Sequence, residues 1–161
     1  MLYDLSASAA AITKGSPTKL LINDRADIAV SSGAAGVHLT TSSLPSSVVR
    51  QTFGEDVLIG VSTHSLEEVR TAAEGGADFA VFGPVFFTES KGEYGEPTGL
   101  PNLASVSAAL SPFPVLALGG LKVDRVMSCI QAGAAGVAGI SMFNDPERLT
   151  ELVRLVSETS T

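Results

Sequence analysis

The 161-residue sequence has no tryptophan, one cysteine, two histidines and only ten lysine and arginine residues. A lone cysteine excludes an internal disulfide framework and a cysteine-based zinc cluster. A formal net charge of −7 without a basic cluster argues against a nucleic-acid surface. No apolar run approaches the roughly 20 residues of a membrane span, and no charged-then-apolar leader precedes a small-residue cleavage site. We therefore expect a cytoplasmic protein that binds small molecules, and neither nucleic acid nor membrane.

Apolar residues are abundant: they make up 45% of the chain. At this length, that composition is ample for the core of one folded domain. We therefore predict that residues 1–161 form a single domain. The flanks of Cys129, "VMSCIQA", are typical of a buried helix face, which predicts a structural role for this thiol.

Three segments of the chain resemble one another: "SSGAAGVHL" (31–39), "EGGADFAVFG" (74–83) and "QAGAAGVAGIS" (131–141). Each has the pattern of a helix end, a glycine suited to a left-handed cap, small residues and a short β-branched strand. Three more apolar runs have the length of strands buried on both faces, namely "KLLIN" (19–23), "LIGVS" (58–62) and "PVLALGG" (114–120). The sequence thus predicts six strands.

Helical patterns fill the intervals, at residues 26–32, 46–53, 65–75, 101–110, 122–132 and 145–157. The Ser65 hydroxyl can accept a hydrogen bond from the amide of Glu68, and the Glu68 carboxylate can accept one from the amide of Ser65. Asp145 and Pro146 form a similar start signal for the last helix. Because strand and helix alternate, we expect a parallel sheet with right-handed crossovers.

Two architectures suit such a chain, an open doubly wound sheet and a closed barrel, and the glycine–alanine repeat favours the barrel. An eight-stranded barrel usually takes about 200 residues or more. Here six strands follow a stretch, "YDLSASAAAITKG", that looks helical. We therefore predict an α/β fold of the (β/α)8 TIM-barrel type with six βα units and the first two strands missing. Residues 1–18 could pack across part of the gap. Exposed strand edges predict a homo-oligomer or a poorly soluble fragment.

The segment "VFGPVFFTESKGEYGEPTG" (81–99) begins as an apolar strand and turns into glycine, charge and hydroxyl groups. A core strand needs only a turn to leave the sheet. A long polar loop with Thr88, Ser90 and Lys91 therefore indicates that an anion is bound there.

Glycine and small polar residues follow the last two predicted strands, as Gly119-Gly120 and Ile140-Ser141. Backbone amides after the last two strands of a barrel form its commonest phosphate site, because glycine lets an anion approach the main chain. These positions predict a phosphorylated ligand.

Five motifs in register, "LINDR", "GVHL", "GVSTHSLEE", "GADFAVFGPVFFT" and "ALGG", resemble the thiamin phosphate synthase and TenI family of barrel proteins, from about residue 19 to 143. In the synthase branch, the resemblance implies that hydroxymethylpyrimidine pyrophosphate is joined to thiazole phosphate with the help of Mg²⁺. It implies that Asn23 and Asp24 face the pyrophosphate and the metal, and that Ser62 faces the pyrophosphate. It also implies phosphate contacts from Thr88, Ser90 and Lys91, and thiazole phosphate held by the amides of Gly120, Ile140 and Ser141.

Two features depart from the synthase pattern. After "GVHL" the synthase has Gln-Glu-Asp, whose Asp is a metal ligand, whereas this chain has "TTSSLP". The strands that carry a Gln-x-Arg-x-Lys motif have no counterpart before residue 19. The TenI branch resembles the chain better, which implies a thiazole tautomerase that needs no metal. Its key histidine corresponds to His64, and imidazole can remove and return a proton near neutral pH.

Our main prediction is therefore a TenI-like thiazole tautomerase with His64 and Lys91 as catalytic residues and a small phosphorylated thiazole as substrate. One alternative is a thiamin phosphate synthase that uses Mg²⁺ with Asp24 as ligand. Another is a non-catalytic phosphate-binding or regulatory protein.

Several of these residues also have structural alternatives. His64 directly precedes Ser65 and could serve the helix start, and Lys91 could be an ordinary solvated loop residue. Asp24 could pair with Arg25 or cap the following helix. We predict a structural role for His38, which lies on a short buried strand.

Overall fold

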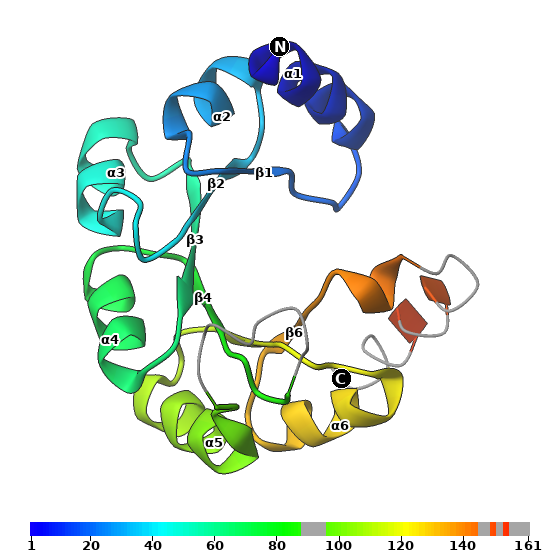
Figure 1. Ribbon diagram of the computed structural model, residues 1–161. Helices are drawn as coiled ribbons and strands as arrows, with labels where there is room; N and C mark the ends of the chain where they lie inside the picture. The colour runs from blue at the N-terminus through cyan, green and yellow to red at the C-terminus, as the bar shows by residue number, and fades with distance from the viewer. Residues whose placement is uncertain (88–95, 145–148, 151–152, 155–161) are drawn as a thin grey trace. The chain divides into compact units, whose positions relative to one another are not determined.

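The six predicted strands are present in the computed structural model, which describes residues 1–87, 96–144, 149–150 and 153–154. They are β1 (Leu21–Asn23), β2 (Gly36–Leu39), β3 (Leu58–Thr63), β4 (Phe79–Phe82), β5 (Val115–Leu118) and β6 (Gly136–Ala138). The strand order in the sheet follows the chain, from β1 to β6. The fold is therefore an open parallel sheet of six βα units, which confirms the barrel-type α/β prediction with units missing (Figure 1).

The helices fall where the sequence places them: α1 (Leu2–Thr13), α2 (Ala26–Ser32), α3 (Ser46–Phe53), α4 (Leu66–Glu74), α5 (Gly99–Leu110), α6 (Val123–Gln131) and the 3-10 turn η2 (Ser141–Phe143). The predicted last helix, 145–157, lies largely outside the described residues, with its start signal Asp145-Pro146. Within the described part of the chain, no helix is long and apolar enough to cross a membrane.

The three repeated segments share one backbone geometry. Their glycines, Gly33, Gly76 and Gly133, have left-handed φ angles of 76°, 79° and 91°. In each case the next residue donates its amide to the carbonyl five positions earlier: Ala34 to Ala29, Ala77 to Ala72 and Ala134 to Cys129. This is the glycine helix cap that the sequence predicts, and it turns the chain directly from helix to strand.

The contacts divide the chain into two compact units. Unit 1 comprises Met1–Thr63 and Arg70–Ala80, and unit 2 comprises His64–Val69 and Val81–Thr161. In unit 1, β1, β2 and β3 pair in parallel, with Leu21 opposite Gly36 and Gly36 opposite Leu58. A side chain at Gly36 would collide with the backbone of Leu58, so close strand packing requires glycine there.

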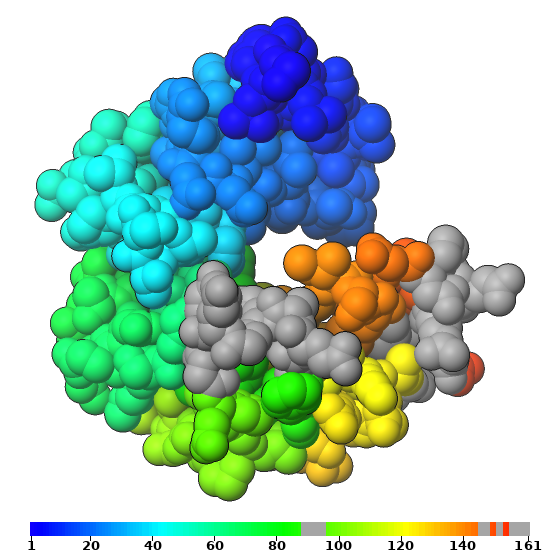
Figure 2. Space-filling model, viewed as in Figure 1, coloured from blue at the N-terminus to red at the C-terminus, as the bar shows by residue number. Residues whose placement is uncertain are grey.

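The N-terminal segment is helical, as predicted, and α1 packs against α2 within unit 1 (Figure 1). Small residues allow this approach: Ser6 is buried, and its hydroxyl donates to the carbonyl of Leu2. Two other positions of α1 carry Leu5 and Ile12, which are 68% and 83% exposed. The dark blue atoms of α1 accordingly lie at the surface in Figure 2.

In unit 2, β5 and β6 pair in parallel, with Leu116 opposite Gly136. The core of this unit includes Phe82, Leu103 and Val126, all of them buried. Cys129 on α6 is fully buried, and its burial raises the pKa of the thiol. A buried neutral thiol is unreactive, so the predicted structural role of Cys129 is confirmed.

Candidate functional site

Asn23 and Asp24 lie at the carboxyl end of β1 in unit 1, where the sequence places the pyrophosphate and metal residues. Asp24 adopts a left-handed φ of 62°, and its amide donates to the carbonyl of His38. Its carboxylate accepts a short hydrogen bond from the hydroxyl of Ser43, in the loop after β2. The Ser43 hydroxyl in turn accepts the amide of Thr40 at 2.7 Å. The loop after β2, which has no acidic residue of its own, therefore orients the carboxylate of Asp24 at the end of β1.

The two structural alternatives for Asp24 are wrong. Arg25 pairs with Asp27 instead, with 2.6 Å between the guanidinium and the carboxylate, and the pKa of Asp27 is lowered to about 2 by this hydrogen bond. The following helix begins after Arg25, and no side chain caps it. The Asp24 carboxylate at the carboxyl end of β1 is therefore bonded to Ser43, and the Arg25 guanidinium to Asp27.

His38 and Ser62 bond to each other across neighbouring strands of unit 1, with 2.8 Å between Nε2 and the hydroxyl oxygen. The His38 ring also lies 6.5 Å from that of Phe79. Burial lowers the pKa of His38, while the negative charge of Asp24 partly opposes the shift. His38 is therefore hydrogen-bonded and half-buried, which agrees with the predicted structural role, and its partner is the Ser62 hydroxyl that the sequence places at the pyrophosphate.

His64 lies in unit 2, two residues before the start of α4, and its ring Nδ1 makes a short hydrogen bond with the carbonyl oxygen of Gly83. A carbonyl oxygen can only accept, so Nδ1 carries the proton and Nε2 is the acceptor of the neutral ring. Ser65 caps the Glu68 amide at 3.2 Å, as predicted. The Glu68 carboxylate accepts a hydrogen bond from the amide of His64 at 2.5 Å, whereas the sequence pattern predicts the amide of the next residue, Ser65.

Gly119 and Gly120 follow β5 in unit 2, with left-handed φ angles of 99° and 59°. A Cβ atom at Gly119 would lie 2.6 Å from Cα of Pro84, and one at Gly120 would lie 2.7 Å from the carbonyl oxygen of Phe86. The amide of Phe86 donates to the carbonyl of Gly119 at 3.1 Å. The glycine pair therefore packs main chain against the loop that leaves β4, which only residues without side chains can do.

Sequence reasoning missed Arg125, on the first turn of α6. Its Nη1 donates to the carbonyl of Gly120 at 2.8 Å, and its guanidinium lies 4.7 Å from the centre of the Phe86 ring. The "VDRV" pattern around it is that of an ordinary helix start and gives no signal of this contact.

The remaining predicted residues fall in two groups. Ile140 and Ser141 are exposed in unit 2, where Ile140 precedes η2 and Ser141 begins it. Thr88, Ser90 and Lys91 lie outside the described residues.

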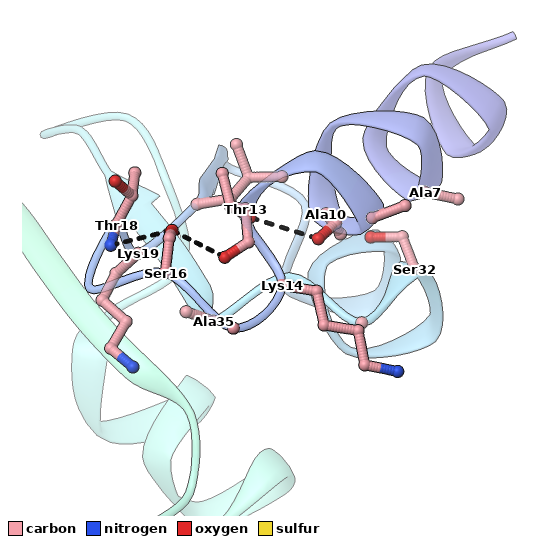
Figure 3. A pocket seen from close by; sticks show the side chains of 13 residues that line it. Ala7, Ala10, Thr13, Lys14, Ser16, Thr18, Lys19, Ser32 and Ala35 are labelled. Atoms are coloured by element: carbon pink, nitrogen blue, oxygen red, sulfur yellow. Dashed lines mark hydrogen bonds between the residues drawn. The ribbon is translucent and has the colours of Figure 1, made fainter.

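A separate cavity of about 440 Å³ lies in unit 1, between α1, the segment that follows it and the end of α2 (Figure 3). Its lining includes Ala7, Ala10, Lys14, Lys19 and Ala35. Lys19 and Ala35 precede β1 and β2, so this cavity lies at the amino ends of the strands. The predicted residues of unit 1, Asn23, Asp24 and Ser62, lie at or near the carboxyl ends.

The fold and these strand-end loops define a TIM-barrel-type α/β protein with two left-handed glycines directly after β5. Residues 1–143 match the family model described as thiamine monophosphate synthase. The chain belongs to this family, and thus to thiamine biosynthesis. The resemblance stated from its motifs is confirmed.

Three similar proteins carry related names. Thiamine-phosphate synthase from Anaeromyxobacter dehalogenans is 46% identical over 131 residues, which cover 80% of this chain and 59% of that protein. The synthase from Chlorobium luteolum is 42% identical over 134 residues, which cover 83% and 63%. The solved thiamine phosphate pyrophosphorylase from Pyrococcus furiosus matches with a TM-score of 0.80 at 26% identity, over 96% of this chain and 77% of that one. The chain thus spans about 60% of the length of these two synthases, and the names do not favour a tautomerase over a synthase.

Proposed function

We propose that this chain acts as a thiamin phosphate synthase, a transferase that joins hydroxymethylpyrimidine pyrophosphate to thiazole phosphate. The observation that carries the proposal is the Gly119-Gly120 loop, whose main chain follows β5 in a conformation that admits no side chain. In the proposal, the amides of this loop, which lies just before the start of α6, bind a phosphate. The names of the similar proteins support the synthase over the tautomerase that the motifs alone favour.

In this reaction the thiazole nitrogen attacks the methylene carbon of the pyrimidine. A carbon–nitrogen bond forms, the carbon–oxygen bond to pyrophosphate breaks, and pyrophosphate leaves with the electron pair. The residues of this chain bind and orient: in the proposal, Gly119, Gly120, Ile140 and Ser141 hold the thiazole phosphate. Thr88, Ser90 and Lys91 bind the phosphates of both substrates, and the charge of Lys91 offsets theirs.

Asn23, Asp24 and Ser62 are proposed to face the pyrophosphate. The left-handed backbone of Asp24 supports this role, because such conformations in residues other than glycine cluster at functional sites. The hydrogen bond from Ser43 keeps the Asp24 carboxylate in one orientation. That carboxylate has about four acceptor positions, so one hydrogen bond leaves room for a further ligand.

The residues present fit a Mg²⁺ ion that takes a single protein carboxylate. Among the described residues, no cluster of three or more acidic, histidine or cysteine side chains occurs. Mg²⁺ usually binds through one or two carboxylates, with substrate phosphates and water as its other ligands. Asp24 would hold the ion, which when bound offsets the charge of the departing pyrophosphate.

The size and assembly of the enzyme are part of the same proposal. The family match runs through residues of both compact units, which supports one domain over residues 1–161. Among the described residues, β1 and β6 are the two ends of the sheet, which supports a homo-oligomer that covers their outer edges.

The proposed synthase activity is tested by measuring the formation of thiamin phosphate. Protein incubated with both substrates should form thiamin phosphate, detected by chromatography, only when Mg²⁺ is present. Asp24→Asn should lower that rate by about 10²-fold or more, because the charge that holds the metal is gone. Equal product without Mg²⁺, or full activity of D24N, would contradict this role of Asp24. No product despite measurable binding of thiazole phosphate would favour the non-catalytic binding protein.

A thiazole tautomerase remains the second candidate, because of the His64 ring. Its protonated Nδ1 and acceptor Nε2 suit a group that takes a proton from the substrate and returns it. His64→Ala should then abolish tautomerisation while the circular dichroism spectrum stays native. Turnover within about tenfold of the unmodified protein would rule out this role, since general acid–base groups contribute ~10²–10⁴-fold.

A further inference from the structure

Arg125 is a partly buried cation whose contacts are not those of an ion pair. Its described partners are the Gly120 carbonyl and the face of the Phe86 ring. None of the ion pairs among the described residues involves Arg125. A guanidinium that keeps part of its surface exposed and pairs with no carboxylate among the described residues has N–H donors left for an anion.

The position of the guanidinium agrees with that expectation. Both of its contacts lie beyond the carboxyl ends of strands, at Gly120 after β5 and at Phe86 after β4. With Nη1 2.8 Å from the Gly120 carbonyl, standard bond lengths place it within about 7 Å of the Gly120 amide nitrogen. A phosphate that accepts a hydrogen bond from this amide is therefore within reach of the Arg125 charge.

The two contacts also fix the orientation of the side chain. A guanidinium has five N–H donors in a planar fork, and the bond to Gly120 uses one of them. Phe86 lies against the cation at 4.7 Å. A guanidinium held by two contacts loses little further side-chain entropy when its remaining donors bind phosphate oxygens.

We propose that Arg125 is the cation of the phosphate site, binding the phosphate of the substrate together with the Gly120 amide. The inference rests on the proposed function, since it assumes that the glycine loop binds phosphate. Its consequence is selectivity: Arg125 favours a dianionic ligand over the same ligand without its phosphate.

Arg125 could serve only to hold the Gly119-Gly120 loop in place through its bond to the Gly120 carbonyl. Two variants distinguish this role from binding phosphate through the positive charge. Arg125→Gln loses the charge but keeps a side-chain N–H that can donate to the Gly120 carbonyl. Arg125→Met loses both the charge and the donor. Lys122→Met is the control, because it removes an exposed positive charge from the residue that precedes α6.

The measurement is a titration with inorganic phosphate, followed by the amide NMR signals of Gly119 and Gly120. In the unmodified protein both signals should shift in a saturable way. R125Q and R125M should each weaken phosphate binding about tenfold or more, as expected for a lost charged hydrogen bond. K122M should change the affinity by less than about twofold. Thiazole alcohol, which lacks phosphate, should bind all four proteins alike.

Three outcomes would overturn the inference. Unchanged phosphate affinity in R125Q would show that Arg125 only holds the loop, and would leave the phosphate site of the proposed function intact. An equal loss in K122M would show a general effect of charge. No phosphate shift at Gly119 or Gly120 in the unmodified protein would reject the phosphate site itself, and the proposed role of Arg125 with it. If R125M fails to fold, R125Q alone decides between charge and loop support.

Discussion

Replacing Gly120 by alanine tests whether the loop after β5 is packed main chain against main chain. The new Cβ would lie 2.7 Å from the carbonyl oxygen of Phe86 and closer still to that of Phe87. Both obstacles are backbone atoms, so neither can rotate away as a side chain could. The segment they belong to is tied to β5 by the bonds of Val85 to Leu118 and of Phe86 to Gly119.

The expected cost has two parts. Alanine at a left-handed φ of 59° loses roughly 1–2 kcal/mol relative to glycine. The forced shift of a packed segment costs about 1–3 kcal/mol more. The free energy of unfolding should therefore fall by about 2–5 kcal/mol, which for a chain of this length lowers Tm by roughly 4–20 °C.

Gly99→Ala is the matched control within the same unit. Gly99 has a similar left-handed φ of 78°, but the nearest heavy atom to its new Cβ would be Cδ of Pro101 at 3.5 Å, an ordinary contact. This variant should lose only the backbone part, about 1–2 kcal/mol. The difference between the two variants isolates the collision at Gly120, because both make the same chemical change.

Urea denaturation followed by circular dichroism gives both free energies of unfolding from the linear dependence on denaturant. G120A should be less stable than G99A by about 1–3 kcal/mol. Equal stability, within about 0.5 kcal/mol, would show that the loop is not packed as described and would refute the reasoning.

Three further predictions concern unit 1. Burial lowers the pKa of His38 below its ordinary value of 6.5, so the unfolded chain takes up a proton first as the pH falls. Stability should therefore decline below about pH 6.5, and urea unfolding of H38Q should show a shallower decline; an equal slope would contradict this. Arg50, 12% exposed, donates to the carbonyls of Gly54, Val57 and Gly76 and pairs with Asp78 at 2.8 Å. R50M should lose about 3 kcal/mol or more in urea unfolding, and a loss under about 1 kcal/mol would be inconsistent with these contacts. Ser43→Asp places a second carboxylate beside Asp24, so Mg²⁺ should raise the Tm of S43D more than that of the unmodified protein; an equal rise would show that the two side chains do not share a site.

The sequence by itself determined the elements and their order. Short apolar runs, helical spacing and glycines at helix ends act over a few residues, so the boundaries of α2 and α3 could be predicted to the residue. The repeated glycine pattern predicted the three left-handed helix caps at Gly33, Gly76 and Gly133. The Gly119-Gly120 loop could also be placed at the end of its strand, because a strand followed by two glycines is a local signal.

Only the tertiary structure decided which side chains meet at the strand ends. Asp24 and Ser43 are 19 residues apart, and His38 and Ser62 are 24 apart. Each pair depends on strand register and on the path of a loop, which local patterns do not encode. Adjacency in the sequence is no better guide: Arg25 directly follows Asp24 yet pairs with Asp27, while the Asp24 carboxylate bonds to Ser43. Arg125 reaches Gly120 only because the start of α6 brings the guanidinium back over the loop that the chain has just left.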